Sequence, residues 1–139
     1  MLSRLVLLAA LSVVGLPVAA RAADEKPHPI IAVVKKQVKD TTKPFTLVVL
    51  LKAKEGQEAK LEAAFVPAVK ATRKEKGCVH YELNRDTQTA GRYLLYERWK
   101  SLQDLEAHLK SAPIKKLLED LKEVTAGAPE ARVMVPAGE

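Results

Sequence analysis

The chain has 139 residues and a formal net charge of +6, and only 4% of its residues are aromatic. Its lysines and arginines are mixed with acidic residues and form no basic stripe with interleaved aromatic side chains, which argues against nucleic-acid binding. One cysteine, Cys78, cannot form an intramolecular disulfide, and with three scattered histidines it provides no dedicated metal-ligand set, so no metal is expected.

The amino terminus has the pattern of an export signal. Arg4 provides a positive charge, Leu5 to Leu16 is apolar, and Ala20-Arg21-Ala22 is a small-residue cleavage site. The pattern predicts a signal peptide over residues 1–22 and a periplasmic or secreted protein. The apolar run is shorter than the roughly 20 residues that span a bilayer, so no stable membrane insertion is expected after cleavage. An uncleaved amino-terminal anchor is the alternative.

Residues 23–44 are predicted to form an amino-terminal extension, with a short helix over Ile30 to Val38 that lies on the domain. Residues 45–135 then form one domain. Phe45 to Lys52 is an apolar run rich in β-branched residues, which is typical of a central strand. Helical spacing from Ala59 onward predicts a helix that Pro67 kinks and that Gly77 ends in a left-handed cap.

Two strands joined by a hairpin loop at 86–91 follow. Cys78 to Arg85 is predicted to place Val79, Tyr81 and Leu83 on one face, with Cys78, His80 and Glu82 on the other. In the strand from Tyr93 to Trp99, alternation places four side chains on a common face. They are Tyr93, Leu95, Glu97 and Trp99.

The carboxyl-terminal part predicts two helices and a strand. Ser101 and Asp104 are typical of a helix N-cap and first turn. The buried stripe of that helix is predicted to contain Leu102, Leu105 and Leu109, with His108 at its flank. Pro113 begins a second helix with an apolar face at 114, 117, 118 and 121. Residues 126–129 form a turn before a short strand over residues 131–135.

This order of elements predicts an α+β fold, the ferredoxin-like split βαβ arrangement, with helices on one face of an antiparallel sheet. The other face also needs a cover. We expect two sheets to pack face to face in a homodimer, forming a dimeric α/β barrel. A short connection folds the helix with His108 back over the strand before it, so His108, Glu97 and Trp99 are predicted to share a partly apolar recess.

Several motifs resemble the antibiotic biosynthesis monooxygenase domain, in particular its small quinol-monooxygenase-like branch. They are Thr72-Arg73-Lys74-Glu75-Lys76-Gly77-Cys78, Tyr81-Glu82-Leu83, Asp86, and Tyr96-Glu97-Arg98-Trp99 with Leu105 and His108. The resemblance implies a dimeric α+β barrel and, for some members, oxygenation of quinols or polycyclic phenols without metal or flavin. Relatives in the same fold bind and degrade haem. Several members carry a pocket-facing Asn on the first strand, which Phe45 to Lys52 lacks, so their mechanism is not carried over whole.

An oxygenase without a cofactor must remove a phenolic proton to give an electron-rich anion. His108 is the candidate base, since imidazole titrates near neutral pH, and Glu97 is the candidate that orients it. Trp99 is the candidate wall for an aromatic ligand. Tyr81 and Tyr93 are the other candidates for substrate binding. The structural alternative is that Trp99 belongs to the core and that Glu97 and His108 form a buried pair that joins helix to strand.

Two classes of function follow. The first is an exported monooxygenase that needs no cofactor and acts on a quinol or phenolic aromatic substrate. The alternative is a non-catalytic dimeric barrel that binds a small hydrophobic ligand or haem. An open cavity that His108 reaches favours the enzyme, whereas a cavity packed shut favours the structural alternative.

Overall fold

A four-stranded antiparallel sheet forms the frame of the domain. The computed structural model describes residues 26–138. The strands are β1 (Phe45–Lys52), β2 (Cys78–Arg85), β3 (Arg92–Trp99) and β4 (Glu130–Met134), in the spatial order β2-β3-β1-β4. This arrangement confirms the predicted α+β, ferredoxin-like fold. The last strand begins and ends one residue earlier than the sequence pattern predicted.

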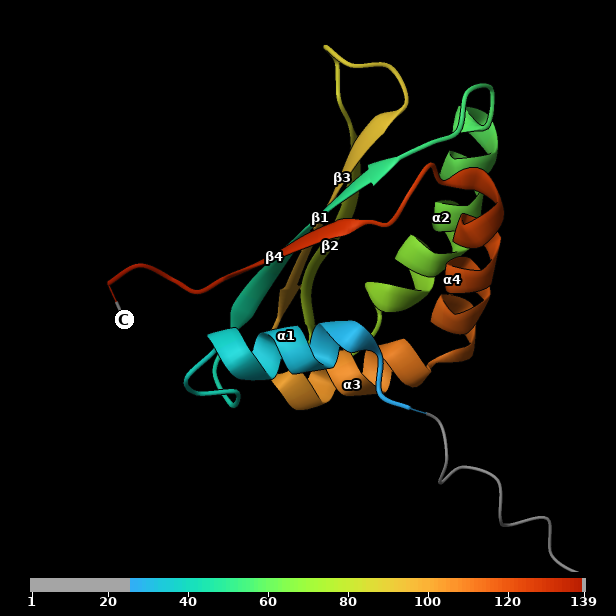
Figure 1. Cartoon of the computed structure of the whole chain (residues 1–139). Helices are drawn as coiled ribbons and strands as arrows, with labels where there is room; N and C mark the ends of the chain where they lie inside the picture. Colours follow the sequence, from blue (N-terminus) through green and yellow to red (C-terminus); the bar gives the residue numbers. More distant parts are fainter. Residues whose placement is uncertain (1–25, 139) are drawn as a thin grey trace, which may run out of the picture.

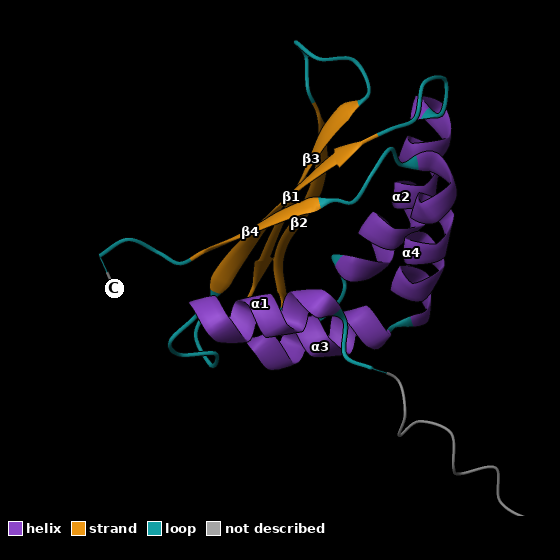
Figure 2. Cartoon of the chain, in the orientation of Figure 1, coloured by secondary structure: helices purple, strands orange, loops and turns teal. Residues whose placement is uncertain are grey.

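The helices cover one face of this sheet (Figures 1 and 2). They are α1 (Pro29–Gln37), α2 (Glu58–Thr72), α3 (Leu102–Lys110) and α4 (Ala112–Val124). Helices α2 and α4 pack side by side, and α1 lies beside α3. Helix α2 continues through Pro67 to Thr72. None of the helices in residues 26–138 is long and apolar enough to cross a membrane.

Strict alternation on β3 creates the inner face of the sheet. Tyr93, Leu95, Glu97 and Trp99 are all buried, as predicted, while the residues between them are only half-buried. On the neighbouring strand β1, Phe45 pairs with Trp99 and Leu47 pairs with Glu97. The inner face therefore combines a continuous apolar surface with one carboxyl group.

The amino-terminal extension contains the predicted helix on the surface of the domain. Helix α1 begins at Pro29, where the missing backbone N–H costs no helical hydrogen bond. One stripe of the helix is buried and anchors it: Ile31, Val34 and Val38, the last being the residue that follows the helix. The export signal predicted over residues 1–22 lies outside the described residues.

A β-bulge corrects the predicted faces of β2. The register with β3 shifts between Cys78 and His80, because Cys78 pairs with Trp99 whereas His80 pairs with Arg98. Val79 is the extra residue and is half exposed. The prediction that Val79 shares a face with Tyr81 was therefore wrong, and Cys78 instead lies in the row that faces the helices.

Gly77 does not form the predicted left-handed cap. Helix α2 ends at Thr72, and Gly77 lies outside the positive-φ glycines of the described chain. Its role is close packing, since a Cβ at this position would collide with the Cβ of Asp104 in the first turn of α3. The hydroxyl of Ser101 in turn accepts a hydrogen bond from the backbone N–H of Asp104. The glycine is therefore needed where α3 starts.

We expect Gly77→Ala to lower the free energy of unfolding by roughly 1–3 kcal/mol, because the added methyl group overpacks a buried contact. Urea denaturation followed by circular dichroism measures this loss. The exposed neighbour Lys74 provides a control, and Lys74→Ala should stay within about 0.5 kcal/mol of the unmodified protein. Equal stability of the two variants would contradict the packing role of Gly77.

Candidate functional site

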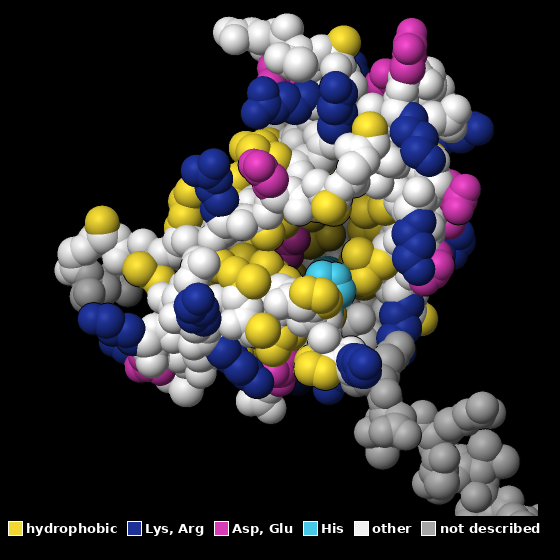
Figure 3. Space-filling view, viewed as in Figure 1, with side chains coloured by type: hydrophobic (Ala, Val, Ile, Leu, Met, Phe, Trp, Pro, Cys, Tyr) yellow, Lys and Arg dark blue, Asp and Glu magenta, His cyan; other side chains and the backbone are white. Residues whose placement is uncertain are grey.

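A cavity of about 760 Å³ lies between the inner face of the sheet and the helices. Its size is in the range of small-molecule binding pockets. Leu47, Val49 and Leu51 of β1 line one wall, and α3 and α4 contribute further leucines. Figure 3 looks into a hollow that hydrophobic side chains surround, with a histidine at its mouth and an acidic side chain inside. The cavity is therefore mostly apolar with a few polar groups.

Three buried polar side chains line this cavity: Tyr81 of β2, Glu97 of β3 and His108 of α3. Their exposed fractions are 2%, 6% and 3%. The sequence predicted that Glu97 and His108 face a common recess, and the structure brings both to one cavity. A carboxyl group, a phenolic hydroxyl group and an imidazole thus face the same cavity.

The carboxyl group of Glu97 is poised to exchange a proton near neutral pH. Burial raises its pKa from 4.5 to about 7, and the negative charge of Glu75 acts in the same direction. The indole N–H of Trp99 donates a hydrogen bond to Glu97 Oε2 at 2.9 Å, which partly opposes that rise. A side chain with this pKa is half ionised at pH 7, as a general base requires.

His108 is not at the rim of its helix stripe, where the spacing predicted it. It is more deeply buried than Leu109, since its ring lies 4.5 Å from that of Trp99 and 5.4 Å from that of Tyr81. Burial lowers the pKa of His108 from 6.5 to about 4, so the imidazole is neutral at pH 7. A neutral imidazole with so low a pKa is a hydrogen-bonding group rather than an effective base.

Glu75 orients His108, in place of the predicted partner Glu97. His108 Nδ1 lies 3.0 Å from Glu75 Oε2, and a neutral ring donates its Nδ1–H to that carboxylate. Within residues 26–138, Nε2 has no hydrogen-bond partner. The relay predicted from Glu97 to His108 was therefore wrong, and His108 presents an unprotonated Nε2 for a ligand.

Tyr81 contributes a hydroxyl group that stays protonated. Its hydroxyl has no hydrogen-bond partner in the described part of the chain. Burial raises the pKa of Tyr81, and the charge of Glu97 raises it further. The phenol is thus available as a hydrogen-bond donor beside the carboxyl group.

Trp99 lies behind the cavity rather than in its wall. Its side chain is fully buried and touches His108 and Tyr81, but it is not among the residues that line the cavity. In this structure Trp99 acts on the site through its ring contact with His108 and its hydrogen bond to Glu97.

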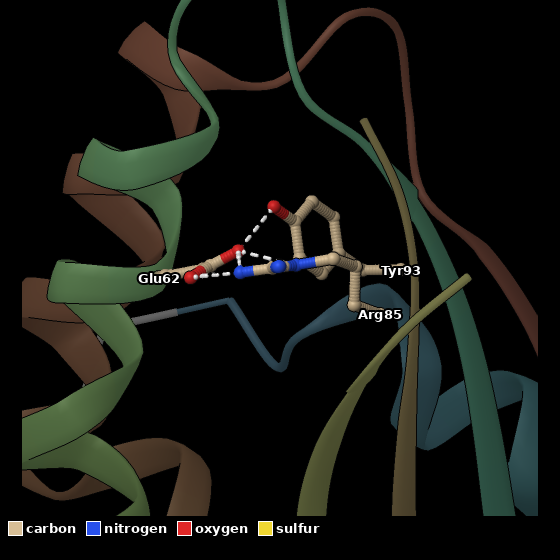
Figure 4. A network of polar contacts seen from close by, with 3 residues as sticks. All are labelled: Glu62, Arg85 and Tyr93. Carbon is tan, nitrogen blue, oxygen red and sulfur yellow. Dashed lines mark hydrogen bonds and ion pairs between the residues drawn. The ribbon is translucent and has the colours of Figure 1, made fainter. Parts of the chain in front are cut away.

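Tyr93, the other tyrosine predicted to bind substrate, points to a separate groove. Its hydroxyl donates to Glu62 Oε1 on α2 at 2.7 Å, and Arg85 binds the same carboxylate through two nitrogens (Figure 4). The hydrogen bonds from Tyr93 and Arg85 lower the pKa of Glu62. This network joins α2 to β2 and β3, and the structure does not bring Tyr93 to the cavity with Glu97.

Two residues of the site were missed from the sequence. Glu75 lies in the turn after α2, where its charge had no periodic pattern to mark it. His28 lies in the stretch predicted only as an amino-terminal extension, and it caps α1 and lines the cavity. Pro29, at the first position of the helix, was the available signal for a helix start.

Comparisons with solved structures agree on the fold, at identities below 25%. The chain shares 24% identity with a candidate antibiotic biosynthesis monooxygenase from Caulobacter crescentus, with a TM-score of 0.65 over 68% of this chain and 90% of that one. A Mycobacterium tuberculosis protein gives 23% identity and a TM-score of 0.65, over 70% of this chain and 98% of that one. For a candidate monooxygenase from Nitrosomonas europaea the identity is 15%, the TM-score 0.67, and the coverage 71% and 95%.

The search of curated proteins gives no match. The profile of the family named antibiotic biosynthesis monooxygenase matches residues 44–120, which is more than half of the chain. The matched region includes Tyr81, Glu97 and His108, which line the cavity, and Glu75, which binds His108. The chain belongs to the antibiotic biosynthesis monooxygenase family.

Proposed function

We propose that this protein is a monooxygenase that acts on a quinol or another phenolic aromatic compound without a bound cofactor. The observation that carries the proposal is Glu97, a carboxyl group whose pKa of about 7 is set by burial in an apolar cavity. Family membership supports the reaction type. The cavity supports the substrate class, since an apolar molecule with an ionisable hydroxyl group matches its apolar walls and its polar groups.

The first step is a proton transfer from the substrate hydroxyl to the carboxylate of Glu97. It yields a phenolate and a neutral Glu97, so no net charge is added to the cavity. The hydroxyl of Tyr81 donates a hydrogen bond to the phenolate oxygen, and the unprotonated Nε2 of His108 accepts one from a second hydroxyl of a quinol. These contacts favour the anion over the neutral phenol.

The phenolate then supplies all the electrons that dioxygen needs. One electron passes from the phenolate to dioxygen, and the two radicals combine at a ring carbon to give a peroxide anion. This anion takes back the proton that Glu97 had accepted, which restores the carboxylate, and the resulting hydroperoxide loses water. A quinol and one dioxygen thereby give a hydroxylated quinone and one water, which balances both atoms and electrons. The apolar walls formed by Leu47, Leu95 and Leu105 keep bulk water away from these intermediates.

Oxygen uptake by the purified protein with a panel of quinols and naphthols tests this proposal. Uptake above the rate of autoxidation, with formation of the hydroxylated quinone, supports it. Tight binding of the same compounds without any oxygen consumption would instead favour a ligand-binding barrel that has no catalytic activity.

We also propose that the protein is a homodimer that pairs the sheet faces opposite the helices. That face carries Val48 and Leu50 of β1 with Leu94 and Tyr96 of β3, all half-buried, and no described helix covers it. A dimer would remove this apolar surface from water.

Light scattering at micromolar concentration is expected to give twice the chain mass. Leu94→Lys places a charge in the middle of this face and should shift the protein toward the monomer. The control is Val66→Lys on α2. Val66 is 66% exposed, so this change should leave the mass unchanged. A monomeric unmodified protein would contradict the proposed dimer.

Export is part of the proposal and is supported by the sequence of residues 1–22 alone. Arg4, the apolar run that follows and Ala20-Arg21-Ala22 have the order of a cleavable signal. A substrate met outside the cytoplasm would then be a compound of the periplasm or of the medium.

A further inference from the structure

Helix α1 forms part of the cavity wall, although it lies outside the region that the family profile matches. That region begins at residue 44, whereas His28, Pro29, Ile30 and Val33 line the cavity. The wall that these residues form is therefore particular to the amino-terminal extension. Figure 1 shows α1 beside α3 at the lower end of the sheet.

Two apolar stripes on α1 serve different purposes. The stripe with Ile31 and Val34 is 4% and 0% exposed and fixes the helix to the domain. Ile30 and Val33, three residues apart, lie on another side of the helix, remain half-buried and line the cavity. A helix that only covered the domain would need the first stripe alone. The second stripe loses its remaining contact with water when a ligand packs against it.

His28 provides a hydrogen-bond donor of fixed tautomer at the mouth. Its Nδ1 accepts the backbone N–H of Ile30 at 3.3 Å, so Nδ1 carries no proton. A neutral ring then has its proton on Nε2, which has no partner among residues 26–138. His108 holds the opposite tautomer deep in the cavity. The two histidines thus present a donor at the exposed mouth and an acceptor at the buried end.

We propose that the segment His28–Val33 selects the ligand of this cavity. Ile30 and Val33 pack against its apolar ring system, and His28 Nε2–H binds an acceptor oxygen that the ligand carries away from its reactive hydroxyl. The preferred ligand is then a hydroxylated fused aromatic with a carbonyl or carboxylate on its far side. This inference rests on the proposed use of the cavity for a hydroxylated aromatic compound.

Equilibrium binding of two fluorescent probes tests the selection. The first, 6-hydroxy-2-naphthoate, carries a carboxylate opposite its hydroxyl, and the second, 2-naphthol, lacks that carboxylate. His28→Ser retains a side chain that caps α1 but removes the Nε2 donor. We expect it to weaken binding of the first probe roughly tenfold, the effect of one hydrogen bond to a charged group, and of the second by less than about twofold.

Ile30→Ala is expected to weaken the binding of both probes by a similar factor, roughly fivefold, because it removes an apolar contact that both ring systems make. The controls are His80→Ser on β2 and Val66→Ala on α2, which lie outside the cavity lining and should change neither affinity. Thermal unfolding of each variant confirms that the fold is retained.

If His28→Ser weakens the binding of both probes equally, the proposed role of His28 is overturned. If Ile30→Ala binds both probes as tightly as the unmodified protein, the proposed role of the helix is overturned. Failure of both probes to bind the unmodified protein at millimolar concentration would overturn the whole inference. Binding is measured with dioxygen excluded, so no turnover occurs. A protein that shows these affinities but consumes no oxygen in air would contradict the proposed oxygenase function and leave the selection by α1 in place.

Discussion

Glu97→Gln is expected to lower oxygen uptake with a quinol substrate by roughly 10²–10⁴-fold, the usual contribution of a general base. Glutamine has the same shape and still accepts the indole N–H of Trp99 through its amide oxygen. It cannot take the phenolic proton. Steady-state oxygen consumption, compared at equal concentrations of folded protein, measures the loss. In the unmodified protein the rate should rise with pH up to about 7, where Glu97 becomes ionised.

The same substitution should stabilise the protein at neutral pH and above. Burial raises the folded-state pKa of Glu97 from 4.5 to about 7, so the unmodified protein loses stability as pH rises through this range. The loss corresponds to roughly 3 kcal/mol once pH exceeds 7, and it disappears below pH 4.5. Urea denaturation at pH 4.5 and pH 8 should therefore show a gain for Glu97→Gln only at the higher pH.

Glu82→Gln is the matched control, because Glu82 lies on β2 outside the cavity, with a side chain that is 45% exposed and paired with His80. It should change neither the rate nor the pH dependence of stability appreciably. Full activity of Glu97→Gln, or an equal pH dependence of stability in Glu97→Gln and Glu82→Gln, would exclude Glu97 as the base. His108, with its low pKa, would then have to be reconsidered through its contact with Glu75.

The fold could be predicted because its elements carry strong local patterns. Phe45 to Lys52 forms the predicted strand with the same bounds, and Ser101 caps α3 as its sequence indicated. Alternation also placed Glu97 and Trp99 on the inner face. The bulge at Val79 was not predictable, since one extra residue in a strand leaves the hydrophobic pattern almost unchanged while it reverses the face of Cys78.

The candidate site was only partly predictable, because its chemistry depends on contacts between segments far apart in the chain. Glu75 and His108 are 33 residues apart, and nothing periodic links the turn after α2 to the middle of α3. The assignment of the base also depended on burial. In water the pKa of a histidine is near neutral, but burial in the cavity lowers that of His108 to about 4. Burial also raises the pKa of Glu97 to about 7, so the glutamate and not the histidine titrates near neutral pH.

Trp99→Ala is expected to have the largest effect on stability, a loss of about 3–5 kcal/mol. The indole is fully buried, and its removal leaves a void beside the rings of His108 and Tyr81. Thermal and urea unfolding measure the loss. Activity should fall as well, but this variant alone cannot separate the packing role of Trp99 from its hydrogen bond to Glu97.

Trp99→Phe makes that separation, because it retains most of the aromatic volume and removes only the N–H that donates to Glu97. That hydrogen bond favours the carboxylate, so its loss raises the pKa of Glu97 further. We expect the midpoint of the pH–rate profile to move up by about one to two pH units, the equivalent of one hydrogen bond to a charged group.

Phe45→Leu is the control for Trp99→Phe. Phe45 is fully buried and pairs with Trp99 across β1 and β3, so the variant loosens the same packing without touching the carboxyl group. A profile that moves equally in both variants would show that the packing around Trp99, rather than its indole N–H, sets the pKa of the base.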